Sequence, residues 1–160
     1  MTIIKPIPEI QIERMQREDL QQVMTIEKEA FPDPWHESFF KRQLRKRKKH
    51  SHLYVAKLQN KVIGYIVFYI YSGEGHILNI AIDTGYRRRG IGKYLLEFAL
   101  EIMEKSGVKE VFLEVSVKNT AALEIYKKYQ FQVFGVRKRY YSNGDDAYVL
   151  CKEMNNVISL

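Results

Sequence analysis

Hydrophobic and polar positions along this chain of 160 residues follow two periods, which together predict a mixed sheet with helices. Apolar residues recur every three or four positions in some segments, which is the spacing of one helix face. Other segments alternate with period two, or are rich in β-branched and aromatic residues, as strands are. The expected helices cover 18–30, 35 into the segment 41–49, 91 up to Gly107, and 119–129. The expected strands cover 10–14, 52–58, 62–71, 76–83, 110–117, 131–140 and 147–154.

Prolines and glycines predict where these elements end. The run Phe31-Pro32-Asp33-Pro34 should end the first helix, because proline lacks an N–H and restricts the residue before it. Within that run, Asp33 is the expected N-cap of the next helix. Asn143-Gly144 predicts a tight hairpin turn between the last two strands. The order β-α-α-β-β-β-α-β-α-β-β contains one β-α-β unit, so we expect two parallel strands joined by a right-handed crossover.

Length and composition are those of an ordinary globular chain. We expect one domain over 10–154, preceded by an irregular segment 1–9 and followed by a tail 155–160. The longest apolar run, 62–71, is too short to cross ~30 Å of hydrocarbon as a helix, and the first residues lack a secretory signal. The single cysteine, Cys151, cannot form an intramolecular disulfide, which favours a reducing compartment. The sequence therefore predicts a cytoplasmic location.

The formal net charge of +7 is concentrated in one place. The segment Lys41–Lys49 carries seven positive charges and no negative ones. Such a run is either a solvated helix face or a surface that attracts a polyanion, such as a ribosome. A basic nucleic-acid-binding domain is a remote alternative, because the run contains no aromatic residue on which a base could stack.

The segment 83–93 carries the first sign of chemistry. It joins a strand to a long helix and reads Asp-Thr-Gly-Tyr-Arg-Arg-Arg-Gly-Ile-Gly-Lys. Two closely spaced glycines let a backbone approach a ligand, and the free N–H groups of a helix start attract anions. Three arginines add positive charge there. These features predict a pyrophosphate site, although a surface turn with solvated charges is the alternative. The segment is neither a Walker loop nor a dinucleotide fingerprint.

These motifs resemble a known family. Arg87-x-x-Gly90-x-Gly92 resembles the acetyl-coenzyme A signature of the GNAT acetyltransferase superfamily. The flanking segments 78–82, 113–115 and 119–126 resemble the same superfamily. Within it, the segment 140–147 resembles protein N-terminal acetyltransferases of the RimI type and their archaeal counterparts. The resemblance implies an α/β (α+β) GNAT fold, with a mixed, mostly antiparallel sheet that splits between the strands 76–83 and 110–117. Helices are expected on both faces.

The resemblance also implies how acetyl-CoA is held. Backbone groups of three strand residues would bind the pantetheine arm, the arginine–glycine turn would wrap the pyrophosphate, and Asn119 would bond near the thioester. The residues implied for this role are Ile80, Ala81, Ile82, Arg87, Arg88, Arg89, Gly90, Ile91, Gly92, Lys93 and Asn119. Asn119 also stands where a helix N-cap is expected, and the two roles can coexist.

The resemblance further implies roles for catalytic and acceptor-binding residues. Glu114 matches a general base and Tyr126 a general acid, while His76 matches a residue that helps to deprotonate the amine through water. Phe31, Tyr140 and Tyr141 are assigned to the first residues of an acceptor peptide.

Each of these residues also has a plain structural interpretation. A carboxylate in an apolar strand could form an ion pair, and Tyr126 could simply pack in the core. His76 could be an ordinary partly buried histidine, and the two adjacent tyrosines could be hairpin aromatics. The histidines and the cysteine show no metal-ligand spacing, so we assign no metal.

The chemistry that fits is direct attack of an amine on a thioester. An α-amine has a pKa of ~8 and is partly neutral at physiological pH, whereas a lysine amine at ~10.4 needs more help. We therefore expect transfer of acetyl to the N-terminal amine of a protein, in the RimI manner that includes ribosomal proteins. The alternative acceptors are a small-molecule amine and a lysine side chain. One departure from the family pattern is Gln130, where a glycine would end the helix in a left-handed conformation at ~1 kcal/mol less.

Overall fold

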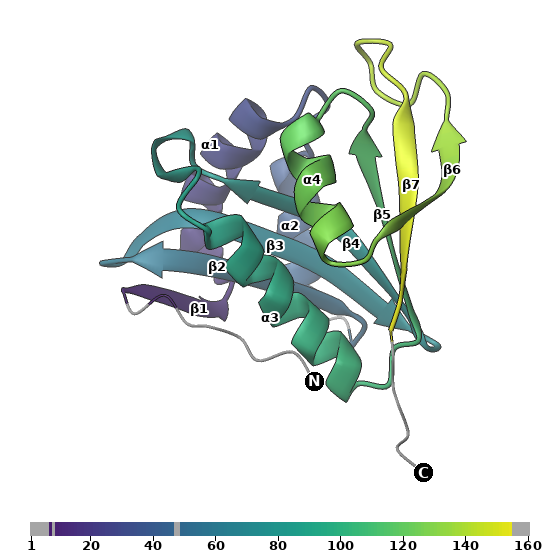
Figure 1. Ribbon diagram of the computed structural model, residues 1–160. Helices are drawn as coiled ribbons and strands as arrows, with labels where there is room; N and C mark the ends of the chain where they lie inside the picture. The colour runs from purple at the N-terminus through teal and green to yellow at the C-terminus, as the bar shows by residue number, and fades with distance from the viewer. Residues whose placement is uncertain (1–6, 8, 47–48, 155–160) are drawn as a thin grey trace.

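The computed structural model describes residues 7, 9–46 and 49–154. Most of the expected irregular segment 1–9, all of the expected tail 155–160 and positions 47–48 of the basic run lie outside the described residues. Figure 1 shows a twisted sheet with helices on both faces, as the sequence predicts. No helix of the described chain is both long enough and apolar enough to pass through a bilayer.

The described strands form a seven-stranded sheet in the order β1-β2-β3-β4-β5-β7-β6. The strands are β1 (Ile10–Arg14), β2 (Ser51–Leu58), β3 (Lys61–Tyr71), β4 (Glu74–Ile82), β5 (Glu110–Ser116), β6 (Gln132–Arg137) and β7 (Ala147–Glu153). Only the pair β4–β5 is parallel, and the other neighbours are antiparallel. The predicted mixed, mostly antiparallel sheet is confirmed.

Four α-helices of the described chain pack in two layers (Figure 1). They are α1 (Leu20–Ala30), α2 (Glu37–Lys46), α3 (Ile91–Lys105) and α4 (Thr120–Lys128), and two single 3₁₀ turns cover Arg17–Asp19 and Thr84–Tyr86. The first core cluster packs α1 and α2 against one face of the sheet around Phe40 and Tyr65. The second packs α3 and α4 against the other face around Leu95 and Leu113.

The sheet opens between β4 and β5. These strands pair only from Glu74↔Glu110 to Ile77↔Leu113, and no partner across the split is recorded for the rest of either strand. The second half of β4 therefore has one free edge, facing β5. This is the split that the family resemblance implies for the parallel pair.

A β-bulge in β4 marks the start of the split. Val67 of β3 is opposite Asn79 and Phe68 is opposite Ile77, so Leu78 is an extra residue without a partner on β3. Because side chains alternate along a strand, one extra residue exchanges the faces that odd and even positions occupy. Ile77 packs in the cluster beneath α3, whereas Asn79 bonds to a residue of α1 on the opposite face.

Two sequence predictions about turns are wrong. Asn143-Gly144 does not form a two-residue hairpin turn, because β6 ends at Arg137 and the loop 138–146 separates it from β7. Within this loop Asp146 accepts the backbone N–H of Arg139, and the Val117 N–H bonds to the carbonyl of Asp146. A turn does form at the tip of the loop, where the Gly144 N–H bonds to the Tyr141 carbonyl at 2.9 Å, but it does not join the two strands directly. Asp33 is not the N-cap of the second helix, which begins at Glu37; its carboxylate bonds to the 138–146 loop instead.

The predicted helix ends are confirmed. Gly107 lies just after α3 at φ +77°, and the Val108 N–H turns back to the carbonyl of Met103. Gln130 adopts the left-handed conformation, φ +71°, after α4, where a glycine would be unstrained. The side chain of Lys152 donates a 2.6 Å hydrogen bond to the carbonyl of Tyr129 at this helix end.

Candidate active site

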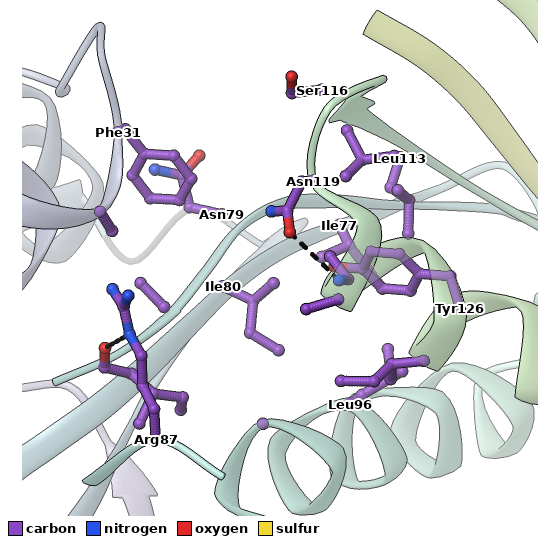
Figure 2. A pocket seen from close by; sticks show the side chains of 18 of the residues that line it. Phe31, Ile77, Asn79, Ile80, Arg87, Leu96, Leu113, Ser116, Asn119 and Tyr126 are labelled. Carbon is purple, nitrogen blue, oxygen red and sulfur yellow. Dashed lines mark hydrogen bonds between the residues drawn. The ribbon is translucent and has the colours of Figure 1, made fainter. Parts of the chain in front are cut away.

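A cavity of about 710 Å³ occupies the split between β4 and β5 (Figure 2). It brings together most of the residues that the sequence assigns to a site. Those residues are Phe31, Ile80, Ala81, Ile82, Arg87, Arg88, Gly90, Ile91, Gly92, Lys93, Glu114, Asn119, Tyr126 and Tyr141. Segments distant in the sequence thus contribute to one continuous surface.

Three of the expected site residues do not line this cavity. His76 stacks on Phe112 with ring centroids 5.4 Å apart, in the part of β4 that still pairs with β5. The guanidinium of Arg89 lies over the ring of Tyr86 at 5.2 Å. Tyr140 is 46% exposed and contacts the cavity only through its neighbour Tyr141, whose ring it meets edge-on. A direct role in the cavity is therefore restricted to the other residues.

The basic end of the cavity is the turn before α3. Gly90 has φ +81°, a conformation that L side chains rarely adopt, although nothing would obstruct a Cβ there. The glycine is therefore required by the backbone conformation rather than by space. Arg88 is also left-handed, at φ +64°. The Tyr94 N–H bonds to the Gly90 carbonyl, so the N–H groups of the preceding residues point out of the helix end.

The same turn carries cations into the cavity. Arg87 uses its Nε to bond the carbonyl of Ile82 at 3.2 Å, which fixes the arginine at the free edge of β4 (Figure 2). Arg88 and Lys93 line the cavity beside it. Three positive side chains and free helix N–H groups are a donor set suited to a pyrophosphate. The residues present therefore fit the phosphate end of a coenzyme.

Asn119 lies at the other side of the cavity, at the start of α4. Its Oδ1 accepts the backbone N–H of Ala122 at 3.2 Å, which confirms the predicted N-cap. The cap uses only the oxygen of the amide, so the Nδ2 group remains available to a ligand.

Glu114 projects from β5 toward the face that carries α1 and α2. It is half-buried and lines the cavity, while Leu113 and Val115 on either side of it are buried on the opposite face. Among the described residues no lysine or arginine lies within ion-pair distance of its carboxylate. The alternative of a structural ion pair therefore has no support. Tyr141 lines the same cavity, and the Glu114 charge is one of the causes that raise the pKa of its phenol.

Two tyrosines flank the centre of the cavity. Tyr126 is 7% exposed and packs edge-on against Phe131. Burial, with a smaller effect from Tyr141, raises the pKa of the Tyr126 phenol. Burial, followed by the charges of Tyr140, Glu114 and Asp33, raises the pKa of Tyr141 to about 12. Both phenols therefore keep their protons at neutral pH and act as hydrogen-bond donors.

One hydrogen bond joins the two loops at the mouth of the cavity. Asp33 Oδ2 accepts the Ser142 backbone N–H at 2.9 Å, and this lowers the pKa of the Asp33 carboxyl. The loop 138–146 is held on its other side by an ion pair of 2.8 Å between Lys118 and Asp145. The predicted acceptor residues Phe31 and Tyr141 lie next to these tied segments.

Sequence reasoning missed several polar residues of the cavity wall, and one of them, Asn79, is bonded to a buried carboxylate. Glu27 of α1 is fully buried, and both of its carboxylate oxygens accept from the Asn79 side chain, at 2.8 and 3.0 Å. The hydroxyl of Tyr65 and the backbone N–H of Trp35 also donate to it. Asn79 lines the cavity. The signal was a charged residue at a position of α1 that the helical spacing would assign to the apolar face.

The described residues offer little support for a metal site or for a nucleophilic cysteine. No group of three or more His, Cys, Asp or Glu side chains is placed there to hold a metal ion. Cys151 is half-buried in β7 and outside the cavity, and burial followed by the Glu110 carboxylate raises the pKa of its thiol. A raised thiol pKa disfavours the nucleophilic thiolate.

Comparison with known proteins identifies the family of this chain. The sequence signature of the Acetyltransferase (GNAT) family matches residues 20–131. The N-alpha-acetyltransferase of Sulfolobus acidocaldarius is 33% identical over an alignment of 145 positions, which covers 82% of this chain and 85% of that protein. The [ribosomal protein bS18]-alanine N-acetyltransferase of Escherichia coli K12 is 32% identical over 135 residues, 84% of this chain and 88% of that protein.

A solved structure extends the comparison to bound ligands. One chain of the NatC complex, crystallised with Gag peptide and CoA, superposes with a TM-score of 0.79 at 26% identity. The superposition covers 91% of this chain and 99% of that one.

Proposed function

The chain belongs to the GNAT family of acetyltransferases, and we propose that it transfers acetyl from acetyl-CoA to the N-terminal α-amine of a protein. Relatives that match over most of their length are named for this class of acceptor, including the N-terminal alanine of a ribosomal protein. The NatC structure, which contains a peptide and CoA, supports the same pair of substrates.

The arginine–glycine turn is the proposed binding site for the pyrophosphate of the coenzyme. Arg87, Arg88 and Lys93 would neutralise the pyrophosphate, with the N–H groups of the α3 start directed at it. The free edge of β4 at Ile80–Ile82 offers backbone groups to the pantetheine amides, as a neighbouring strand would. Asn119 Nδ2, which the helix cap leaves free, would bond near the thioester. When bound, the coenzyme supplies an acetyl group activated as a thioester.

The proposed acceptor end lies beneath the two tied loops. Phe31 and Tyr141 line it directly, and Tyr140 supports Tyr141 from outside. An extended peptide terminus would enter between these residues, and the charge of Glu114 favours an amine at its inner end.

In the proposed mechanism, Glu114 takes the proton that the amine loses as it attacks, directly or through a water molecule. Tyr126 donates a hydrogen bond to the departing sulfur. Because burial raises the pKa of Tyr126, the phenol stabilises a thiolate by donating a hydrogen bond better than by complete proton transfer. His76 is not assigned to the first step, since it does not line the cavity.

One observation carries the proposal. Glu114, a carboxylate without an ion-pair partner among the described residues, and Tyr126, a phenol without a described hydrogen-bond partner, face one cavity whose other end is basic. Every fully buried side-chain oxygen of the described residues has a hydrogen-bond partner, whereas the Tyr126 hydroxyl has none recorded. The hydroxyl is therefore not fully buried, and it opens to the cavity that Tyr126 lines. A base, an acid and a phosphate site in one cavity are what acetyl transfer to an amine requires.

An acceptor panel tests the function. The protein would be incubated with acetyl-CoA and peptides that begin with different residues, each with a free or a blocked N-terminus, alongside polyamines and lysine side chains. We expect mass spectrometry to locate acetyl on free α-amines, first on an alanine-initiated bS18 peptide. Turnover of polyamines or lysine side chains without turnover of any peptide α-amine would refute the proposed acceptor.

The basic run is proposed to guide the enzyme to a ribosome. Arg42 and Arg45 are exposed on α2, whose opposite face buries Phe40. Reversing both charges, Arg42→Glu with Arg45→Glu, should reduce co-sedimentation with ribosomes at low salt and leave peptide turnover unchanged. Equal co-sedimentation of both proteins would contradict this contact.

A further inference from the structure

The buried Glu27–Asn79 pair has no role in the function described so far. Glu27 is fully buried next to the cavity, a position at which an ionisable side chain is costly unless fully hydrogen-bonded. Donors from three segments converge on it: Asn79 in β4, Tyr65 in β3 and the N–H of Trp35 after α1. Its backbone carbonyl also accepts the Phe31 N–H at 3.2 Å. Glu27 therefore holds both ends of the turn 31–35.

The carboxylate dictates which way the Asn79 amide faces. A carboxylate only accepts hydrogen bonds, so the amide nitrogen of Asn79 must point toward Glu27, and it does at 2.8 and 3.0 Å. Asn79 Oδ1 must then point away from Glu27. No hydrogen-bond donor to this oxygen is recorded. Among the described residues every fully buried side-chain oxygen has a partner, so Asn79 Oδ1 is not fully buried. Asn79 Oδ1 is thus an acceptor presented to the cavity (Figure 2).

The bulge at Leu78 brings this oxygen to the side of the sheet where Glu114 lies. Before the bulge, the odd-numbered residue Ile77 faces α3; after it, Asn79 and Ala81 face α1. On β5, Glu114 also points to the α1 side, because its neighbour Leu113 packs beneath α3 and α4. Asn79 and Glu114 therefore face the same end of the cavity from opposite sides of the split.

We propose that Asn79 Oδ1 accepts a hydrogen bond from the attacking amine and that Glu27 is the positioning residue that fixes this orientation. An attacking amine needs one N–H deprotonated and its lone pair aimed at the thioester carbon. Glu114 takes the first proton, and a second N–H bonded to Asn79 sets the direction of the lone pair. This assignment rests on the proposed function, since it names the residue that aligns the acceptor amine in the same site.

Binding of a matched pair of acceptors tests the role of Asn79. One is a peptide with a free α-amine, and the other is its des-amino analogue, which lacks only that amine; calorimetry measures both in the presence of CoA. Wild type should bind the amine peptide more tightly than its des-amino analogue. Asn79→Ala should reduce the ratio of the two Kd values by about 10-fold, as expected for the loss of one hydrogen bond to the amine. A purely structural change would weaken both ligands equally. An unchanged preference would overturn the assignment.

Glu27→Gln tests the positioning role without touching the substrate. The substituted side chain carries an NH₂ group, toward which Asn79 can turn its oxygen, so the asparagine amide would present Nδ2 to the amine. We expect kcat/KM for the acceptor to fall about 10-fold while the Kd for acetyl-CoA stays within a factor of about two. Tyr65→Phe is the matched control, because it removes another donor to Glu27 and keeps the carboxylate, whose two oxygens accept from Asn79. Acceptor kcat/KM falling equally in both variants would contradict a specific orienting role.

The two proposals fail separately. Should wild type acetylate only small amines, the proposed acceptor is wrong, and the Asn79 test proceeds with that amine and its des-amino analogue. Should wild type acetylate peptides while Asn79→Ala keeps its preference for the α-amine, the proposed function stands and the Asn79 assignment is wrong.

Discussion

The carboxylate of Asp33 and the backbone N–H of Ser142, 109 positions apart in the sequence, are joined by a hydrogen bond of 2.9 Å. This bond links the turn after α1 to the loop between β6 and β7. Because Phe31 and Tyr141 line the cavity directly beside the two bonded residues, the tie holds the acceptor end of the cavity in shape.

Removing this tie should weaken acceptor binding selectively. We expect Asp33→Ala to raise the acceptor KM several-fold with little change in the Kd for acetyl-CoA, because the coenzyme end lies at the other side of the split. Steady-state kinetics and calorimetry measure the two quantities. Glu29→Ala is the control, since it removes an exposed carboxylate from the neighbouring helix without a recorded bond. The same rise in KM in both variants would point to a general charge effect instead.

Glu114→Gln tests the general base. The substitution keeps the shape of the side chain and removes its basicity, so kcat should fall by about 10²–10⁴-fold while coenzyme affinity stays near that of wild type. The defect should shrink as the pH rises, because more of the amine is then already neutral. If the variant keeps more than about half of the wild-type kcat at neutral pH, Glu114 is structural and is not the base.

Tyr126→Phe tests the proposed donor to the sulfur. The variant removes one hydroxyl and leaves the packing against Phe131 intact. We expect kcat to fall at an unchanged acceptor KM, and the defect to grow with acyl donors whose leaving thiols are more basic. Rates that decline equally for all leaving groups would exclude a role in stabilising the thiolate.

Gly90→Val tests the phosphate turn. A β-branched residue cannot readily adopt φ +81°, so the start of α3 should rearrange and calorimetric affinity for CoA should be lost. Gly85→Ala is the matched control in the same loop, where no positive φ is required and the new Cβ meets only ordinary contact. Undiminished affinity in Gly90→Val would remove the turn from the binding site.

Alkaline pH should destabilise the protein through its buried phenols. The pKa of Tyr141 is raised to about 12 in the folded state, against ~10 in an unfolded chain. Between these values the unfolded state binds fewer protons than the folded state, so the free energy of unfolding falls as the pH rises. Urea unfolding between about pH 9 and 12 measures this decline, which should be shallower in Tyr141→Phe. A parallel decline in the two proteins would show that Tyr141 titrates as a free phenol does.

The sequence predicts the elements of this protein well because their periodicity is strong. Ile91, Leu95 and Met103 are buried on one face of α3 as their spacing requires, and the alternating apolar residues of β5, such as Val111 and Leu113, are buried on one face of that strand. Local turn chemistry is less reliable where distant residues compete. The dipeptide at 143–144 does take part in a turn, closed by the Gly144 N–H on the Tyr141 carbonyl, but this turn is only the tip of the longer loop 138–146. That loop is bonded to the distant residues Asp33 and Val117.

The candidate site was predictable only where motifs are contiguous in sequence. The turn 87–93 could be located from its local pattern, whereas Glu114 and Tyr126 were singled out only by the family resemblance; the cavity contains most of these residues. Glu27 and Asn79 could not, because their relation depends on a bulge that changes which face Asn79 occupies. Strict alternation along the numbered strand would place Asn79 on the same face as residue 77, toward α3, so periodicity alone assigns it to the wrong layer.

The bulge residue Leu78 lies where the pairing of β4 with β5 ends, and we infer that it keeps the rest of the two strands apart. A bulge bends its strand and increases the local twist, and Leu78 stands directly after Ile77, the last residue of β4 that pairs with β5. Deleting Leu78 would leave Asn79 on the face of Glu27, because Ile77 and Asn79 would then be consecutive and alternate. A straightened β4 could, however, continue its ladder with β5 and fill the edge on which the proposed coenzyme site depends. One residue of strand length thus separates an open cleft from a continuous sheet.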